Sequence, residues 1–72
     1  MIRVTDIMGQ TGYYRCSPEG KIQASEDTRS WHIQRNFRGK RVNMRKETID
    51  SVEDKLLKQL VSGDYIMSAV KL

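Results

Sequence analysis

The segment SWHIQRNFRGKRVNMRK, residues 30–46, decides how this 72-residue chain is expected to fold. Successive side chains of a β-strand point to opposite faces, and the segment shows this alternation twice. We therefore predict a β-ribbon of two strands, residues 31–37 and 40–46. Its apolar face collects Trp31, Ile33, Phe37, Val42 and Met44. The opposite face is polar, so burial of the apolar face would leave the polar face outward.

The turn of this ribbon is expected at Arg38-Gly39. A loop of two or four residues places the apolar side chains of both strands on one face, whereas a loop of three residues separates them. Gly39 supplies the positive φ angle that such a turn usually needs. The hydrophobic pattern therefore selects an even loop.

The polar face and turn of the ribbon carry the side chains that hydrogen-bond base edges and phosphates in protein–DNA complexes. A twisted two-stranded ribbon is also narrow enough to enter the major groove. We therefore predict a nucleic-acid-binding surface made by His32, Gln34, Asn36, Arg38, Lys40, Arg41, Asn43, Arg45 and Lys46. The alternative is an ordinary solvated face that keeps a small protein soluble.

Positive charge is concentrated in the same part of the chain. The net charge is +4, with 13 basic and 9 acidic residues. Seven of the basic residues lie within residues 29–46, where there is no acid: Arg29, Arg35, Arg38, Lys40, Arg41, Arg45 and Lys46. A basic block against a mildly acidic remainder produces the kind of local field that attracts a phosphate backbone.

A second hairpin is predicted upstream, around the turn Pro18-Glu19-Gly20. Proline at the first turn position and glycine at its end fit a type I turn followed by a bulge. In that register Cys16 faces Ile22 and Tyr14 faces Ala24, while Tyr13, Arg15, Lys21 and Gln23 form a polar side that extends the basic surface. Residues 2–8 are predicted as a further strand, and whether it lies at a sheet edge stays open.

An amphipathic helix is predicted from about Ile49 to Val61. Asp50 and Glu53 have the spacing of a capping box, and Gly63 is a natural stop. The apolar residues Ile49, Val52, Leu56, Leu57, Leu60 and Val61 recur at helical spacing and are expected to pack on the apolar face of the ribbon. The solvent side is expected to carry Glu53, Asp54, Lys55, Lys58 and Gln59.

The order of elements predicts one α+β domain spanning residues 1–72. We expect a small antiparallel sheet of two hairpins, with three to five strands, packed on one C-terminal amphipathic helix. Residues 65–72 fit a strand, a short second helix or a partner-binding tail, and the sequence does not separate these.

The short length and the single cysteine limit what can stabilise the domain. One Cys and one His cannot form an internal disulfide or a structural zinc site, so we expect no metal and no cofactor. A homodimer would supply further burial, and the oligomeric state stays open. No segment has the length of a membrane span or a signal peptide, so we expect a cytoplasmic protein without membrane contact.

A family resemblance adds to this interpretation. The pattern from Trp31 to Val42, with its Gly39-Lys40-Arg41 turn and a helix soon after, resembles AP2-like modules and the related arm-binding domains of phage-type integrases. The resemblance implies a three-stranded sheet that is backed by one helix and lies in the DNA major groove. It further implies base contacts from Gln34, Asn36, Arg41, Asn43 and Arg45, and phosphate contacts from Arg38 and Lys40. The chain differs from the pattern in its extra N-terminal residues, in its tail after Gly63 and in lacking an integrase catalytic domain.

No arrangement of residues in the sequence indicates catalysis. Cys16 and His32 have no recognisable motif around them, and there is no glycine-rich phosphate loop. We therefore expect a non-enzymatic regulatory protein of phage or prophage type that binds nucleic acid, with DNA preferred over RNA. The alternative is a mobile-element regulator, such as an antirepressor or an inhibitor of host defence, that sequesters another regulatory protein.

Overall fold

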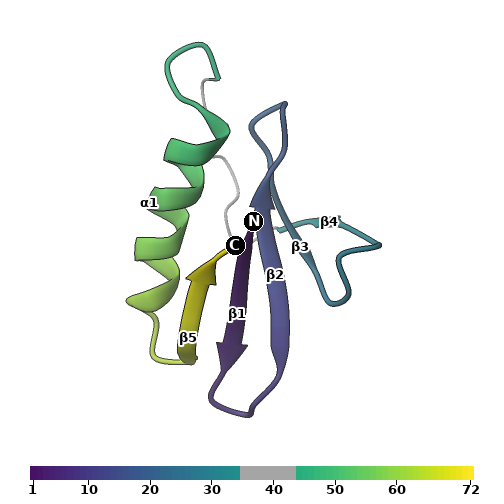
Figure 1. Cartoon of the computed structure of the whole chain (residues 1–72), viewed down its shortest axis with the longest axis vertical. Coiled ribbons are helices and arrows are strands. Elements are labelled where there is room, and N and C mark those ends of the chain that lie inside the picture. The colour runs from purple at the N-terminus through teal and green to yellow at the C-terminus, as the bar shows by residue number, and fades with distance from the viewer. Residues whose placement is uncertain (35–43) are drawn as a thin grey trace.

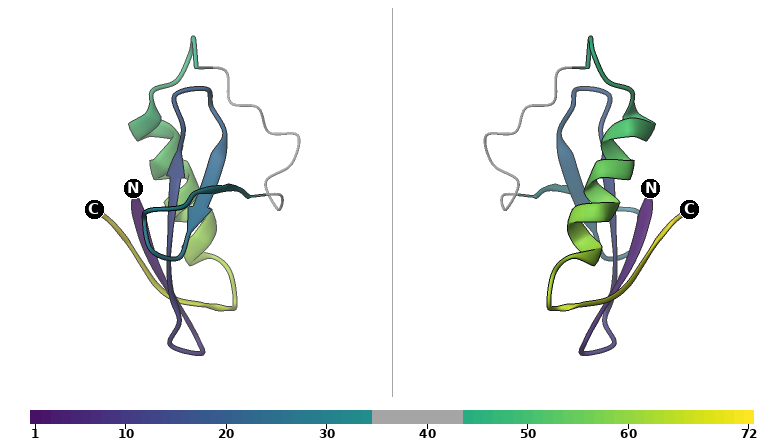
Figure 2. Two further views of the ribbon diagram at one scale, coloured as in Figure 1. Left: turned by 90° about the vertical axis from the view of Figure 1, so that its right-hand side faces the viewer. Right: turned by 90° about the vertical axis from the view of Figure 1, so that its left-hand side faces the viewer.

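The computed structural model describes residues 1–34 and 44–72 and shows an α+β fold (Figure 1). The elements, in chain order, are β1 (Ile2–Asp6), β2 (Thr11–Cys16), β3 (Ile22–Ser25), β4 (His32–Ile33), α1 (Ile49–Val61) and β5 (Ile66–Lys71). The five strands form one antiparallel sheet in the order β4-β3-β2-β1-β5. The helix packs on one side of it and faces the viewer in the right-hand view of Figure 2. The predicted fold class is confirmed.

The hairpin of β2 and β3 has the predicted register. Cys16 pairs with Ile22 and Tyr14 pairs with Ala24. Gly20 has a φ of +82° and donates its N–H to the carbonyl oxygen of Ser17 at 2.9 Å. Turn chemistry therefore sets this register locally, because only glycine adopts that φ without strain.

The two terminal strands pair with each other. β1 ends at Asp6, whose carboxylate accepts the N–H groups of Met8 and Gln10 at 2.9 Å each and so closes the turn to β2. β5 runs antiparallel to β1, with a register shift after Thr5. Of the three alternatives for the C-terminal segment, the strand is therefore correct, and β1 lies inside the sheet.

The helix has the predicted bounds, Ile49–Val61, but its N-cap lies two residues before the predicted one. Thr48 is the N-cap: its hydroxyl accepts the N–H of Ser51, while the Ser51 hydroxyl accepts the N–H of Thr48, both at 3.1 Å. The prediction of Asp50 and Glu53 as the capping pair was wrong, because this earlier Thr-x-x-Ser sequence satisfies the same backbone donors. Asp50 lies instead in the first turn, where its charge favours the helix dipole.

The core lies between α1 and the face of the sheet that we call the helix face. Its buried side chains are Ile2, Val4, Cys16, Ile22, Val52, Leu56 and Leu60. The expected packing of the helix on the ribbon was wrong for Ile33, which is 58% exposed, and Trp31 is only half-buried. Met44 does pack against the core, and Phe37 and Val42 lie outside the described residues. The buried side chains on the sheet side of the core come from β1, β2 and β3.

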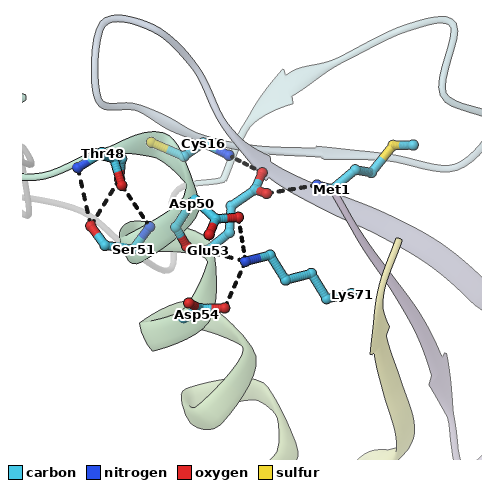
Figure 3. A network of polar contacts seen from close by, with 8 residues as sticks. All are labelled: Met1, Cys16, Thr48, Asp50, Ser51, Glu53, Asp54 and Lys71. Carbon is cyan, nitrogen blue, oxygen red and sulfur yellow. Dashed lines mark hydrogen bonds and ion pairs between the residues drawn. The ribbon is translucent and has the colours of Figure 1, made fainter.

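A buried carboxylate joins the helix to the sheet (Figure 3). Glu53, expected on the solvent side, is 5% exposed. It accepts the N–H of Cys16 at 3.2 Å and pairs with the Met1 ammonium group at 2.6 Å. A buried charge needs such partners, and the end of β2 supplies one of them. Beside it, Lys71 of β5 pairs with Asp50 and Asp54 of α1 at 2.5 and 2.7 Å.

The predicted ribbon is only partly confirmed within the described residues. β4 comprises His32 and Ile33 alone, and residues 44–46 form a turn where a strand was predicted. The residues between, 35–43, lie outside the described part of the chain, and so does the predicted turn at Arg38-Gly39.

The assignment of faces in this segment was inverted. Ile33 pairs with Gln23 and His32 pairs with Ala24, which lies on the helix face like its neighbour Tyr14. Ile33 therefore points to the side away from the helix. The cause is the non-local pairing of β4 with β3, which fixes the faces irrespective of local hydrophobicity.

Candidate nucleic-acid interface

The side of the sheet away from α1 collects basic and aromatic side chains, and we call it the open face. The ladder pairs place there Arg3 beside Tyr13 and Val70, and Arg15 beside Gln23 and Ile33. The strand residues of the open face are Arg3, Thr5, Thr11, Tyr13, Arg15, Gln23, Ser25, Ile33, Ser68 and Val70. None of them is acidic, so the two guanidinium groups face solvent without a carboxylate on the same strand face.

Arg15 is held in a fixed position at the centre of this face. Its Nε donates to the Gln23 side-chain oxygen at 2.8 Å, and its guanidinium carbon lies 3.9 Å from the centroid of the Trp31 ring. The Trp31 indole N–H donates to the carbonyl oxygen of Thr28 at 3.1 Å. A guanidinium stacked on an aromatic ring keeps its charge and its remaining donors available to an anion. The two side chains therefore form a rigid cationic and aromatic unit.

Arg3 and Tyr13 form the second pair on the open face. They are direct cross-strand neighbours, and Arg3 is exposed while Tyr13 is half-buried. Across the strands, Arg3 pairs with Val70 of β5, and Tyr13 pairs with Ser25 of β3. A phenol ring next to an exposed arginine offers a stacking surface and a phosphate partner within one cross-strand pair.

The loop between β3 and β4 closes over one end of the open face. Ser25 is buried there, and the Asp27 carboxylate accepts the Ser25 hydroxyl and the N–H groups of Arg29 and Ser30 at 3.2, 2.8 and 3.1 Å. These hydrogen bonds, first those from Arg29 and Ser30, lower the pKa of Asp27. These donors therefore stabilise the ionised form of Asp27.

Two of the predicted site residues come together on the helix-face side of β4. His32 is exposed, and half-buried Gln34 donates its backbone N–H to Ile22 at 2.9 Å and its amide to the Tyr14 hydroxyl at 3.4 Å. Tyr14, His32 and Gln34 help to line an open hollow of about 430 Å³. They do not share a face with Arg3 and Arg15.

Two further predicted site residues lie elsewhere. Arg45 and Lys46 are exposed in the turn that precedes α1, and all views place this turn near one end of the molecule, away from β4 (Figures 1 and 2). The structure therefore does not bring them to His32 and Gln34. The other predicted site residues, Asn36, Arg38, Lys40, Arg41 and Asn43, lie outside the described residues.

Arg3 and Trp31 were missed as members of a surface. Arg3 stands between two buried apolar residues of β1, and this alternation already placed it on the solvated face. Trp31 was predicted to lie in the core because it is hydrophobic. In the structure, Arg15, which lies two strands away, stacks on its ring. The useful signal was the polar side of the upstream hairpin, which contained Tyr13 and Arg15.

Two kinds of arrangement are absent from residues 1–34 and 44–72. No group of three or more His, Cys, Asp or Glu side chains is arranged there to hold a metal ion. Within the same residues, no helix has the length and apolar character needed to cross a membrane. Cys16 is buried, and this burial, followed by the charges of Glu53 and Glu47, raises the pKa of its thiol.

Comparisons with known proteins identified no similar protein. The sequence matches no protein-family model. Neither a curated protein nor a solved structure matches it. The geometry of the open face and the charge of the chain therefore remain as the guides to function.

Proposed function

We propose that this protein is a small non-enzymatic regulator that binds nucleic acid across the open face of its sheet. The observation that carries the proposal is the grouping of Arg3 and Arg15 with Tyr13 and Trp31 on one face whose strands present no acid. Arginines neutralise phosphates, and exposed aromatic rings stack on bases. The basic residues of the segment 29–46 add to the attraction through the overall charge of +4.

The width of the sheet favours a single strand over a duplex groove. Five strands about 4.8 Å apart make a face roughly 19 Å wide, whereas the major groove is about 12 Å wide. The whole face therefore does not fit a groove, but unstacked bases can lie across it. The major-groove mode implied by the resemblance requires the ribbon of residues 31–46 and stays a separate prediction.

Salt-dependent binding of matched oligonucleotides tests the proposal. Fluorescence anisotropy would compare single-stranded DNA, single-stranded RNA and duplex DNA of one sequence. If about four phosphates are neutralised, single-strand affinity falls roughly 50-fold between about 50 and about 200 mM salt. Binding that is insensitive to salt, or absent for all three probes, would overturn the proposal. Preference for the duplex would point to the ribbon instead.

Matched charge removals locate the interface. Arg3→Gln is expected to weaken binding and to reduce the salt slope by about one. The control Lys58→Gln removes one charge from an exposed position on α1 and should leave both unchanged. The double variant Arg45→Gln, Lys46→Gln tests the surface predicted from the sequence. A larger loss in the double variant than in Arg3→Gln would move the interface to the segment before α1.

A second candidate function is binding of a regulatory protein. It is favoured by large exposed hydrophobic side chains outside the open face, among them Met8, Tyr65 and Met67 at 81%, 74% and 65% exposure. Exposed apolar groups of this size often mark contact surfaces. Affinity for a protein partner that survives both salt and Arg3→Gln would support this function over the first.

A further inference from the structure

The sheet has two unequal edges in the described residues. One edge is β4, which has only two residues. The other is β5, a six-residue strand with β1 on one side only. A short edge strand offers little to a partner strand, whereas a long edge presents a row of unpaired backbone groups. The two edges therefore differ in what they can bind.

The hydrogen-bond pattern shows which backbone groups of β5 point outward. The N–H of Leu72 donates to the carbonyl oxygen of Met1 at 2.8 Å, and the ladder continues as Arg3 opposite Val70. Hydrogen-bonded and non-hydrogen-bonded pairs alternate in an antiparallel ladder. The N–H and C=O groups of Ala69 and Lys71 therefore point away from β1. In the right-hand view of Figure 2, the C-terminal half of β5 runs beside the helix and not behind it.

This half of β5 lacks the usual protection of an edge. The register shift lies near Ile66, so residues 68–72 form a regular stretch without a bulge. Val70 and Leu72 are 46% and 58% exposed. The single charge, on Lys71, is already paired with two carboxylates of α1. Val70 and Leu72 therefore present apolar side chains along this edge, and the one side-chain charge of residues 68–72 is held by α1.

We infer that β5 pairs antiparallel with β5 of a second copy of this chain, about a two-fold axis at Val70. This register places Ala69 opposite Lys71 of the other copy, so that the outward N–H and C=O groups meet in two hydrogen-bonded pairs. Val70 meets its own symmetry mate on the open face, and Ser68 faces Leu72. A β-branched pair at the axis, together with outward N–H and C=O groups that meet in register, makes the edge complementary to itself. The two sheets would then form one continuous sheet, with both open faces on the same side.

Sedimentation velocity over a range of concentrations tests this dimer. We expect the weight-average sedimentation coefficient to rise with concentration. Val70→Lys should raise the dimer dissociation constant by about tenfold or more, because it places two like charges face to face. The control Val61→Lys adds the same charge at a comparably exposed position on α1 and should have little effect. A monomer at all concentrations, or equal effects of the two variants, would overturn the inference.

Disulfide formation tests the register of the β5–β5 pairing independently of the dimer dissociation constant. Non-hydrogen-bonded antiparallel neighbours have Cα atoms about 4.5 Å apart, which a disulfide can span. Val70→Cys should therefore form an interchain disulfide rapidly under mild oxidation. Position 68 lies opposite Leu72 of the other copy, so Ser68→Cys should crosslink much more slowly. The unmodified chain should not crosslink, because Cys16 is buried. Faster crosslinking of Ser68→Cys would contradict the inferred pairing.

Discussion

The two faces of the sheet are made by the same strands yet have different chemistry. On the helix face, Ile2, Val4, Cys16 and Ile22 are at most 9% exposed and pack against α1. On the open face, the alternate residues of these strands, apart from buried Ser25, remain at least partly accessible and include two arginines. The period of two in a β-strand lets one set of residues stabilise the fold while the other set stays available for binding. Substitutions on the two faces should therefore have separable effects.

The largest effect on stability is expected from the core of the helix face. Leu56→Ala removes a side chain that is 4% exposed and should lower the free energy of unfolding by about 2–5 kcal/mol. Urea denaturation followed by circular dichroism would measure it. Val61→Ala on the same helix is the control, since Val61 is 55% exposed and its truncation should cost roughly 0.5 kcal/mol or less. Equal losses would mean that the core has been placed wrongly.

The buried carboxylate should give the next largest effect. Glu53→Ala leaves the Cys16 N–H buried without its acceptor and should cost about 1–3 kcal/mol, while Glu53→Gln keeps a carbonyl and should cost less. Glu26→Ala, at an exposed position, should change stability by about 0.5 kcal/mol or less. The same denaturation experiment compares the three. A negligible effect of Glu53→Ala would contradict the burial of this side chain and would favour the solvent-exposed position predicted from the sequence.

The helix cap should have a smaller effect. Thr48→Ala removes the hydroxyl that accepts the Ser51 N–H and should cost about 1 kcal/mol. Thr48→Ser keeps the hydroxyl and should retain most of the stability. Thermal denaturation of the two variants checks this. If both lose the same amount, the methyl group and not the cap is responsible.

The smallest effect is expected from the Cys16 thiol and appears only at alkaline pH. Its pKa is raised above the ordinary value of 9.0, chiefly by burial. A raised pKa means that the unfolded state releases the proton first, so the contribution to stability is present below pH 9.0 and declines as the pH rises above it. Cys16→Ala should flatten this alkaline decline. Thiol alkylation of the native protein should be slow at pH 8 and fast in urea, and rapid native alkylation would contradict burial.

Local signals in the sequence predicted the β2–β3 hairpin and the helix, whereas the rest needed contacts between distant residues. The Pro18-Glu19-Gly20 turn fixes its register within a few residues, and the helical period needs only its own segment. The position of Ile33 depends on pairing with Gln23, and the burial of Glu53 depends on the end of β2. No local pattern contains these contacts, so the face of β4 and the solvent side of α1 were assigned wrongly.

The candidate site divides in the same way. Tyr13 and Arg15 were found because the register of their hairpin was correct, and Arg3 and Trp31 were missed because β1 and β4 join the face through pairing with other strands. Hydrophobicity also favoured Trp31 as a core residue, whereas the structure places its ring against the Arg15 guanidinium. Which side chains share a surface is thus set by sheet topology.

The helix face stabilises the protein, and we propose that the open face binds nucleic acid. Two-dimensional ¹H–¹⁵N NMR of the labelled protein, titrated with a short single-stranded oligonucleotide, tests it most directly. We expect the resonances of the Arg3, Tyr13 and Arg15 amides and of the Trp31 indole N–H to shift with a common dissociation constant. The amide resonances of α1 should not change. Shifts confined to α1, or to the turn at residues 44–46, would contradict it.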